Sequence, residues 1–269
     1  MSDDRTDATD DRIAFRRGVI RPFQCLGTGF QLIKEQYWLF LGITVVGVLI
    51  ASFVPLGILL GPMMCGIYYC LLRQFRGRSV KFEMLFRGFD DFLQSLIATL
   101  LMLVPLIAIL VPAYILLIVG MVASMPKPAP GGPPPAGPGG GFFAALGAFY
   151  VVVLVVSILV QVFFFFTYPL IADKKLSGVQ AVGTSFRAAM GNFGGVLGLV
   201  ALIFLLNIAG TFACCVGSFF VMPIHYAAFA VAYREVFGED ETPRPPEPPE
   251  AADYGEPDEP PATPEPGRA

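Results

Sequence analysis

Charge is scarce in this chain. Of the 269 residues only 14% are charged, whereas 55% are hydrophobic and the mean hydropathy is +0.67. A soluble domain carries about 25% charged residues, so the deficit argues against an ordinary soluble domain and indicates a membrane protein. The charges are also unevenly distributed, because both ends of the chain are acidic and the part between them is basic.

Histidine and paired cysteines, which many catalytic and metal sites need, are scarce as well. His225 is the only histidine, so no His pair or triad can form. The five cysteines show neither CxxC nor Cys/His ligand spacing, and we expect them to act as small apolar residues. The chain contains no phosphate-cradling loop, nucleophile elbow or metal-ligand cluster. The sequence therefore predicts no catalytic residue, no cofactor and no metal.

Long uncharged runs are what the chain has instead. They cover residues 37–72, 92–125, 142–172 and 193–233. One crossing of a bilayer core needs about 20 apolar helical residues, so the first and last runs are long enough for two helices each, turning near Pro55 and near Cys214. The prediction is an all-α, polytopic transmembrane bundle of about six spans, at approximately 37–54, 57–72, 92–122, 142–171, 193–212 and 215–236.

The remaining segments predict one membrane domain with unstructured ends. Residues 13–36 mix apolar and basic side chains, which is typical of short amphipathic helices at the lipid headgroups, interrupted by Pro22 and the Gly27–Gly29 pair; a soluble helical lead-in is the alternative. Residues 125–141 form a Pro/Gly linker. We expect disorder in the acidic segment 1–12 and in the acidic, proline-rich tail 239–269. The transmembrane domain is thus 13–238, and no secretory signal precedes it.

The basic residues alternate with the predicted spans. Thirteen Lys and Arg residues fall in the segments that six spans would place on one side, and Lys127 alone falls on the other. The positive-inside rule then places both termini in the cytoplasm, which predicts a multi-pass protein of the bacterial inner membrane.

Two parts of the sequence are similar to each other. Gly27-Thr28-Gly29-Phe30 precedes the first predicted hairpin much as Gly183-Thr184-Ser185-Phe186 precedes the last one. Pro62, Arg73 and Gly77 have the same spacing as Pro223, Arg234 and Gly238. The spacing predicts two helix pairs, each preceded by a short interfacial helix.

Three short motifs resemble a known group of proteins. They are Leu85-Phe86-Arg87-Gly88-Phe89 in a basic loop, Pro169-Leu170-Ile171-Ala172-Asp173, and Ser185-Phe186 ahead of the last hairpin. Over residues 25–238 the chain resembles a family of uncharacterised bacterial polytopic membrane proteins, some of which resemble the membrane portion associated with glycerophosphodiester phosphodiesterases. The resemblance implies a membrane-embedded helical fold and transfers no activity.

A few polar side chains inside the apolar runs are the candidate functional residues. His225 is an ionisable group at membrane depth and is therefore a functional candidate, although a structural hydrogen bond, for example to Asn207, is the competing explanation. We expect Asn207 and Gln161 to form hydrogen bonds between helices. Asp90-Asp91 resembles half of a Mg²⁺-diphosphate motif without its partner, so we expect these residues to cap a helix.

Two further patterns predict structural roles. We expect Asp173, with Lys174 and Lys175, to form a solvated ion pair at the end of a span. Gly194, Gly195, Gly198 and Ala201 have the small-residue spacing of close helix contacts.

The functional prediction is a non-catalytic membrane scaffold that organises lipids or partners. Its expected partners are membrane lipids and, through the acidic tail, a cytoplasmic protein, but no nucleic acid. A transporter or permease for a neutral or lipidic substrate is the alternative, since no charged residue interrupts any span. An intramembrane enzyme would have only His225 and Asp90-Asp91 to work with.

Overall fold

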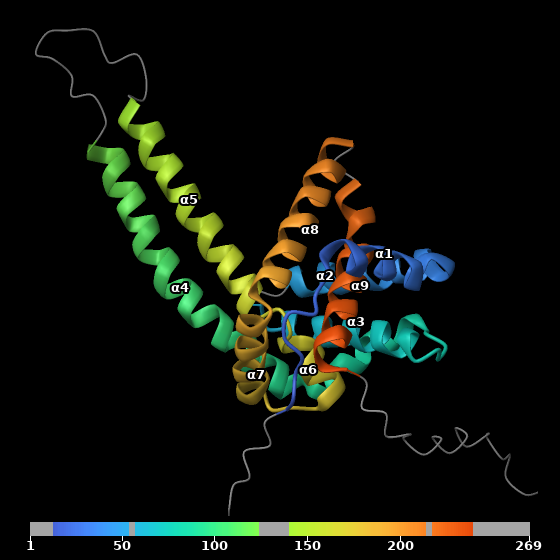
Figure 1. Ribbon diagram of the computed structural model, residues 1–269. Coiled ribbons are helices and arrows are strands. Elements are labelled where there is room, and N and C mark those ends of the chain that lie inside the picture. Colours follow the sequence, from blue (N-terminus) through green and yellow to red (C-terminus); the bar gives the residue numbers. More distant parts are fainter. Residues whose placement is uncertain (1–12, 54–56, 124–139, 214–216, 239–269) are drawn as a thin grey trace, which may run out of the picture. The chain divides into compact units, whose positions relative to one another are not determined.

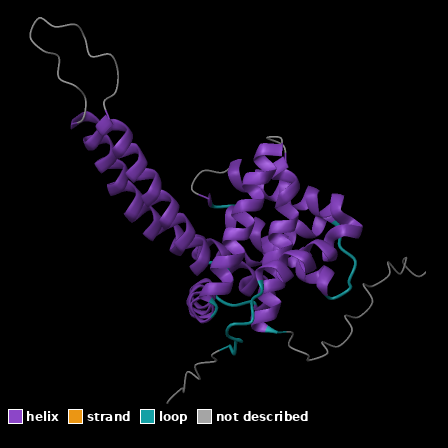
Figure 2. Cartoon of the chain, turned by 45° about the horizontal axis from the view of Figure 1, so that its top comes forward, coloured by secondary structure: helices purple, strands orange, loops and turns teal. Residues whose placement is uncertain are grey.

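The computed structural model describes residues 13–53, 57–123, 140–213 and 217–238, and within these ranges all regular structure is helical (Figures 1 and 2). The predicted turns near Pro55 and Cys214, the acidic ends and almost all of the Pro/Gly linker lie outside the described residues. The elements are α1 (Pro22–Ile33), the 3₁₀ helix η1 (Lys34–Gln36), α2 (Tyr37–Phe53), α3 (Leu60–Phe75), the 3₁₀ helix η3 (Phe82–Asp91), α4 (Phe92–Ala123), α5 (Gly140–Phe163), α6 (Thr167–Lys174), α7 (Gly178–Gly191), α8 (Phe193–Ala213) and α9 (Gly217–Phe237).

Four helical stretches are long and apolar enough to cross a membrane. They are Pro22–Phe53, Phe82–Ala123, Gly140–Lys174 and Phe193–Phe212. The predicted all-helical class is therefore confirmed for the described part of the chain, with four stretches that have the length and composition of membrane spans. The predicted number of six spans is not confirmed.

Two predicted spans are too short or not apolar enough to count among these stretches. They are the inner helices α3 and α9. With 16 residues, α3 is about 24 Å long at 1.5 Å per residue, which is shorter than a bilayer core of roughly 30 Å. The 21 residues of α9 include His225, Arg234 and Glu235, which lower its hydropathy. Both helices bury most of their residues in the protein, so their surroundings are other helices.

Several predicted boundaries are wrong. Pro22 does not interrupt a helix but begins α1, where its missing N–H is not needed, and α1 continues through Gly27 and Gly29. The predicted span 142–171 is two helices, because a turn at residues 164–166 separates α5 from α6. The last two residues of the predicted linker belong to α5.

The predicted repeat is present, and it has a third copy. Each of the short helices α1, η3 and α7 precedes a pair of longer helices, namely α2–α3, α4–α5 and α8–α9. Each short helix also places a small residue against the second helix of a different pair. A methyl group on Gly29 would lie 2.7 Å from the backbone nitrogen of Ala228 in α9, and one on Gly88 would collide with the carbonyl oxygen of Pro62 in α3. The hydroxyl of Ser185 donates to the Phe163 carbonyl at the end of α5.

The three copies share two further features. The small residue is followed by a phenylalanine that stays exposed, namely Phe30, Phe89 and Phe186. The second helices α3 and α9 end near a glycine with positive φ, Gly77 (+66°) and Gly238 (+65°), and α6, which follows the second helix α5, ends at Lys175 (+54°). The structure therefore consists of three similar units, in which the short helix of one unit packs on the second helix of another.

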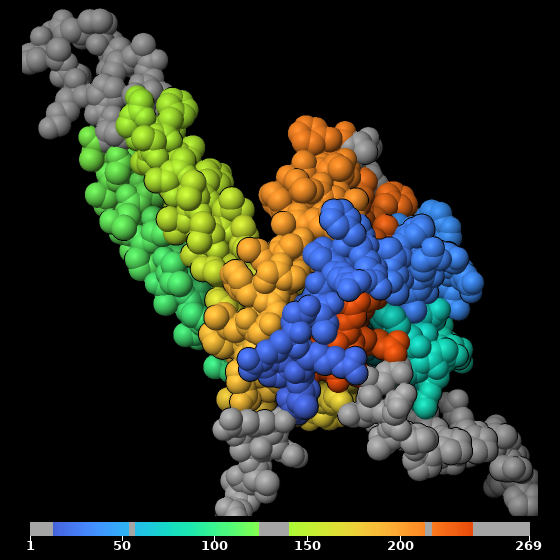
Figure 3. Space-filling view, in the orientation of Figure 1, coloured from blue at the N-terminus to red at the C-terminus, as the bar shows by residue number. Residues whose placement is uncertain are grey.

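The pair α4–α5 exposes most of its apolar surface. Gly120 approaches Ala145 and the rings of Tyr114 and Phe149 lie 6.2 Å apart, so the two helices lie side by side along their length (Figures 1 and 2). Beyond Thr99 the only buried residue of α4 is Leu117, and the only buried residue of α5 is Val162. Figure 3 shows this surface, coloured green, which a bilayer would solvate.

Candidate functional site

His225 lies in α9, two residues after Pro223. Its ring stacks on Tyr226 with centroids 4.8 Å apart and meets the edge of Phe229 at 4.4 Å. The Nε2 atom is buried and has no hydrogen-bond partner among the described residues. The imidazole thus packs as an aromatic group, and one of its nitrogens remains available.

Asn207 does not form the predicted hydrogen bond with His225. Its amide nitrogen donates to the carbonyl oxygen of Ile203 in the same helix, at 2.9 Å. The polar link between α8 and α9 is formed instead by the hydroxyls of Thr211 and Ser218, which are 2.8 Å apart. Sequence spacing could not decide this, because the rotation of α8 determines which polar side chain faces α9.

Gln161 also differs from the prediction. Its side chain is exposed and forms no interhelical hydrogen bond within the described chain. It lies two residues before the end of α5. The structure therefore does not bring His225, Asn207 and Gln161 together into one site.

The charged segments meet at one end of the helices, and their ion pairs join different segments. Asp91 accepts from Lys175 at 2.5 Å, so this carboxylate pairs with a distant cation instead of serving the expected capping role. Asp173 pairs with Arg76, from the loop after α3, while its neighbour Lys175 pairs with Asp91. The hydroxyl of Tyr233 donates to the same carboxylate at 2.9 Å. These contacts connect the loop after α3, the start of α4, the end of α6 and the end of α9.

The predicted small-residue face of α8 packs against the N-terminal arm, residues 13–21, and the start of α1. Methyl groups on Gly195 and Gly198 would touch Ile20 and Pro22, whereas Gly194 faces open space and Ala201 is exposed. The arm appears in dark blue in Figure 3, crossing α7 and α8. Close contact at these glycines therefore serves the arm and the first residue of α1.

Asn192, which the sequence analysis did not single out, holds this arm in place. It is only 3% exposed, and its amide nitrogen donates to the Arg16 carbonyl at 2.9 Å and to the Ala188 carbonyl at 3.0 Å. Its amide oxygen accepts from the Val19 nitrogen at 3.3 Å. The backbone nitrogen of Arg16 also donates to the Val236 carbonyl of α9 at 2.8 Å.

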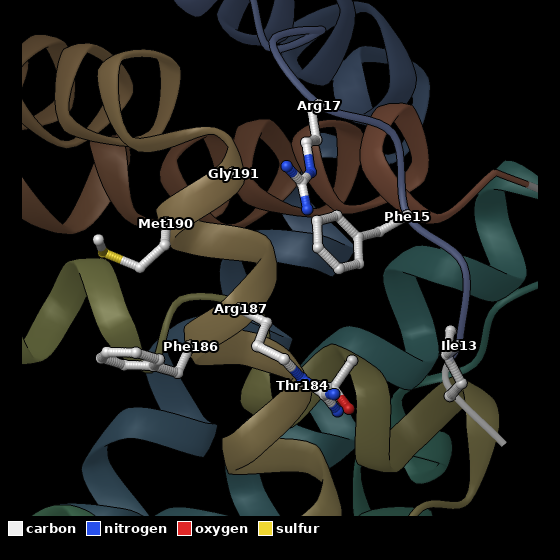
Figure 4. Close-up of a pocket in the computed structure, with 8 residues that line it drawn as sticks. All are labelled: Ile13, Phe15, Arg17, Thr184, Phe186, Arg187, Met190 and Gly191. Carbon is white, nitrogen blue, oxygen red and sulfur yellow. The ribbon is translucent and has the colours of Figure 1, made fainter. Parts of the chain in front are cut away.

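A pocket of about 400 Å³ lies between the arm and α7 (Figure 4). Two arginines line it, Arg17 from the arm and Arg187 from α7, and no carboxylate among the described residues does. Neither arginine pairs with a described carboxylate. The other lining residues are Ile13, Phe15, Thr184, Phe186, Met190 and Gly191.

The pocket is both cationic and apolar, a combination that suits an anionic amphiphile. The guanidinium of Arg17 lies 5.7 Å from the centre of the Phe15 ring. On the opposite wall, the ring of Phe186 packs on Phe163 at 4.8 Å. In the sequence the two arginines indicate only topology, since 170 residues separate them.

The three motifs of the family resemblance occupy packing positions. Leu85 is fully buried and Gly88 lies against Pro62. Pro169, Leu170 and Ile171 are buried, and Ser185 bonds the α5–α6 turn. No family model, no curated protein and no solved structure matches this chain. The resemblance therefore remains a prediction. No described group of three or more His, Cys, Asp or Glu side chains could hold a metal ion.

Proposed function

We propose that the protein is a non-catalytic scaffold of the bacterial inner membrane that organises lipids or partner proteins. In this proposal the chain crosses the bilayer about six times, with both termini in the cytoplasm. The ion-paired end with its arginines then faces the cytoplasmic leaflet, where anionic lipids attract basic residues. The family resemblance to polytopic bacterial membrane proteins is part of the same proposal.

The observation that carries the proposal is the exposed apolar surface of α4–α5. In the most apolar stretch of Phe82–Ala123 only 6% of the residues are buried inside the protein. A helix pair that serves only its own fold would bury one face of each helix. Here side chains on several faces remain available to acyl chains or to the helices of a partner.

A photo-crosslinking experiment tests this surface. Leu116 is 70% exposed and its neighbour Leu117 is 8% exposed, so the two positions form a matched pair on one helix. We expect a benzophenone amino acid at position 116, in native membranes, to capture phospholipid or a second protein. The same probe at position 117 should react within its own chain. Crosslinks from position 116 that stay within the chain would contradict the proposal.

The acidic, proline-rich tail 239–269 is the expected attachment site for a cytoplasmic partner. It carries ten acidic residues and ten prolines. Crosslinking with and without residues 239–269 separates a partner held by the tail from one held by the helices.

A permease for a neutral or lipidic substrate is the second candidate, and His225 favours it. A buried ring nitrogen without a partner could bind a polar group that passes between the helices. Pro105 and Pro112 in α4 and Pro223 in α9 are sites at which a helix can bend. Uptake into proteoliposomes that is lost in His225→Phe would favour this function over the scaffold.

A further inference from the structure

The charge of Arg187 is not required by the fold around it. The equivalent positions of the other two units carry Gln31 and Asp90, each one residue after the exposed phenylalanine. Arg187 is exposed and has no described carboxylate partner. The same short-helix position thus accepts a neutral or an acidic residue elsewhere in the molecule, and only the unit that lies beneath the N-terminal arm has a cation there.

Arg17 lines the same pocket from the arm, and the backbone on both sides of it is fixed. Asn192 bonds the Arg16 carbonyl and the Val19 nitrogen on either side of it, and Arg16 is bonded to α9. Gly191 allows the approach, since a methyl group there would lie 3.0 Å from the Phe15 ring and 3.2 Å from Cγ of Arg17. The arm side of the pocket is therefore organised before any ligand binds, which lowers the entropic cost of binding.

The pocket lies where apolar surface gives way to charge. Phe186 lines it and packs on Phe163, the last residue of the apolar helix α5. On its other side are two guanidinium groups, whose planar forks match the oxygens of a phosphate. A soluble anion would use the arginines and leave Phe186 and Met190 unused, whereas a phospholipid would use both.

We propose that this pocket binds the phosphate of an anionic phospholipid from the cytoplasmic leaflet. Arg17 and Arg187 hold the phosphate, and Phe186 and Met190 contact the glycerol and the first acyl carbons. The inference rests on the proposed function in one respect, because the basic end must face a leaflet.

The experiment measures lipid binding by the full chain in non-ionic detergent. The probe is tail-labelled phosphatidylglycerol, with tail-labelled phosphatidylcholine as the zwitterionic comparison. We expect Arg17→Gln and Arg187→Gln each to weaken phosphatidylglycerol binding about tenfold, the size of one charge-assisted contact. Arg187→Gln copies the residue that the first unit carries at Gln31. Arg21→Gln is the matched control, since it removes a charge at the end of the arm but outside the pocket, and its affinity should stay within about twofold of wild type.

Four results would overturn the inference. Equal weakening by all three substitutions would assign binding to overall charge, and equal affinity for both lipids would remove the preference for an anion. Full competition by glycerol 3-phosphate would make the ligand a soluble phosphate. Binding that appears only after residues 1–12 are deleted would assign the pocket to the chain's own acidic segment.

Two measurements separate this inference from the proposed function. Each variant is checked by thermal unfolding, and because both side chains are exposed we expect wild-type stability. Crosslinks from position 116 do not involve the pocket and should persist in Arg187→Gln. A wild-type chain that gives the crosslinks but shows no preference for phosphatidylglycerol overturns only the pocket, whereas a wild-type chain that shows the preference but gives no crosslinks overturns only the scaffold.

Discussion

At Gly29 the helices α1 and α9 come into close backbone contact. The α1 backbone at this residue lies against Ala227 and Ala228 of α9, with no room for a side chain. Gly27 is two residues away in the same helix and has nothing within 4 Å of its own methyl position. The two glycines therefore play different roles, although the sequence shows them as a pair.

Alanine substitutions at these two glycines should have opposite effects. Gly29→Ala must push α1 away from α9, and overpacking of this kind costs roughly 1–3 kcal/mol of unfolding free energy. Gly27→Ala replaces an exposed helical glycine and should stabilise by up to about 1 kcal/mol. Equilibrium unfolding in mixed detergent micelles measures both values. A Gly29→Ala protein as stable as Gly27→Ala would show that the close approach is absent.

The hydrogen bonds of the buried residue Asn192 could not be predicted from the sequence. In the sequence it is one polar residue between two helices, which predicts a helix end and nothing more. Its three hydrogen-bond partners include two that are more than 170 residues away. Partners at that separation are set by the fold, so no local pattern could identify them.

At the scale of elements, the joint between α5 and α6 depends on α7. Ser185 is fully buried, donates to the Phe163 carbonyl at 2.7 Å and accepts from the Phe166 nitrogen at 3.1 Å. These are backbone groups that a helix break leaves unpaired. The third unit therefore uses a hydroxyl where the first two use the close approach of a glycine.

Ser185→Ala should destabilise the protein without loss of packing volume. The substitution leaves the Phe163 carbonyl and the Phe166 N–H buried and unpaired, at a cost of roughly 1–3 kcal/mol. Ser157→Ala is the control, because Ser157 is exposed on α5. Hydrogen exchange would localise the effect, with faster exchange at residues 163–166 in Ser185→Ala. Unchanged exchange there would contradict the role of this hydroxyl.

The short helices α1, η3 and α7 show which repeat signals a sequence carries. The Gly-Thr-Gly-Phe and Gly-Thr-Ser-Phe segments are similar enough to be noticed, and they predicted two units. The third segment, Phe86-Arg87-Gly88-Phe89, shares only its last two residues with the first. Its equivalence follows from its contact with α3, which depends on the backbone approach and not on residue identity.

At the scale of the whole molecule, the proposed topology makes a prediction about sides. A reporter that is active only in the cytoplasm, fused after Gly77, should be active, because that residue lies in the basic loop after α3. The same reporter fused after position 130 should be inactive, and a periplasmic reporter there should be active. Cytoplasmic activity at both positions would contradict the proposed topology.

The sequence by itself determined that this chain is helical and that it has stretches long and apolar enough to span a membrane. Uncharged runs of the required length are sufficient for that conclusion, because the transfer of apolar residues into lipid depends on composition and length alone. Only the tertiary structure decided that α3 and α9 are inner helices, which charges form pairs, and that Arg17 and Arg187 line one pocket. These features depend on which faces of distant segments meet, and that information is not local to any stretch of the chain.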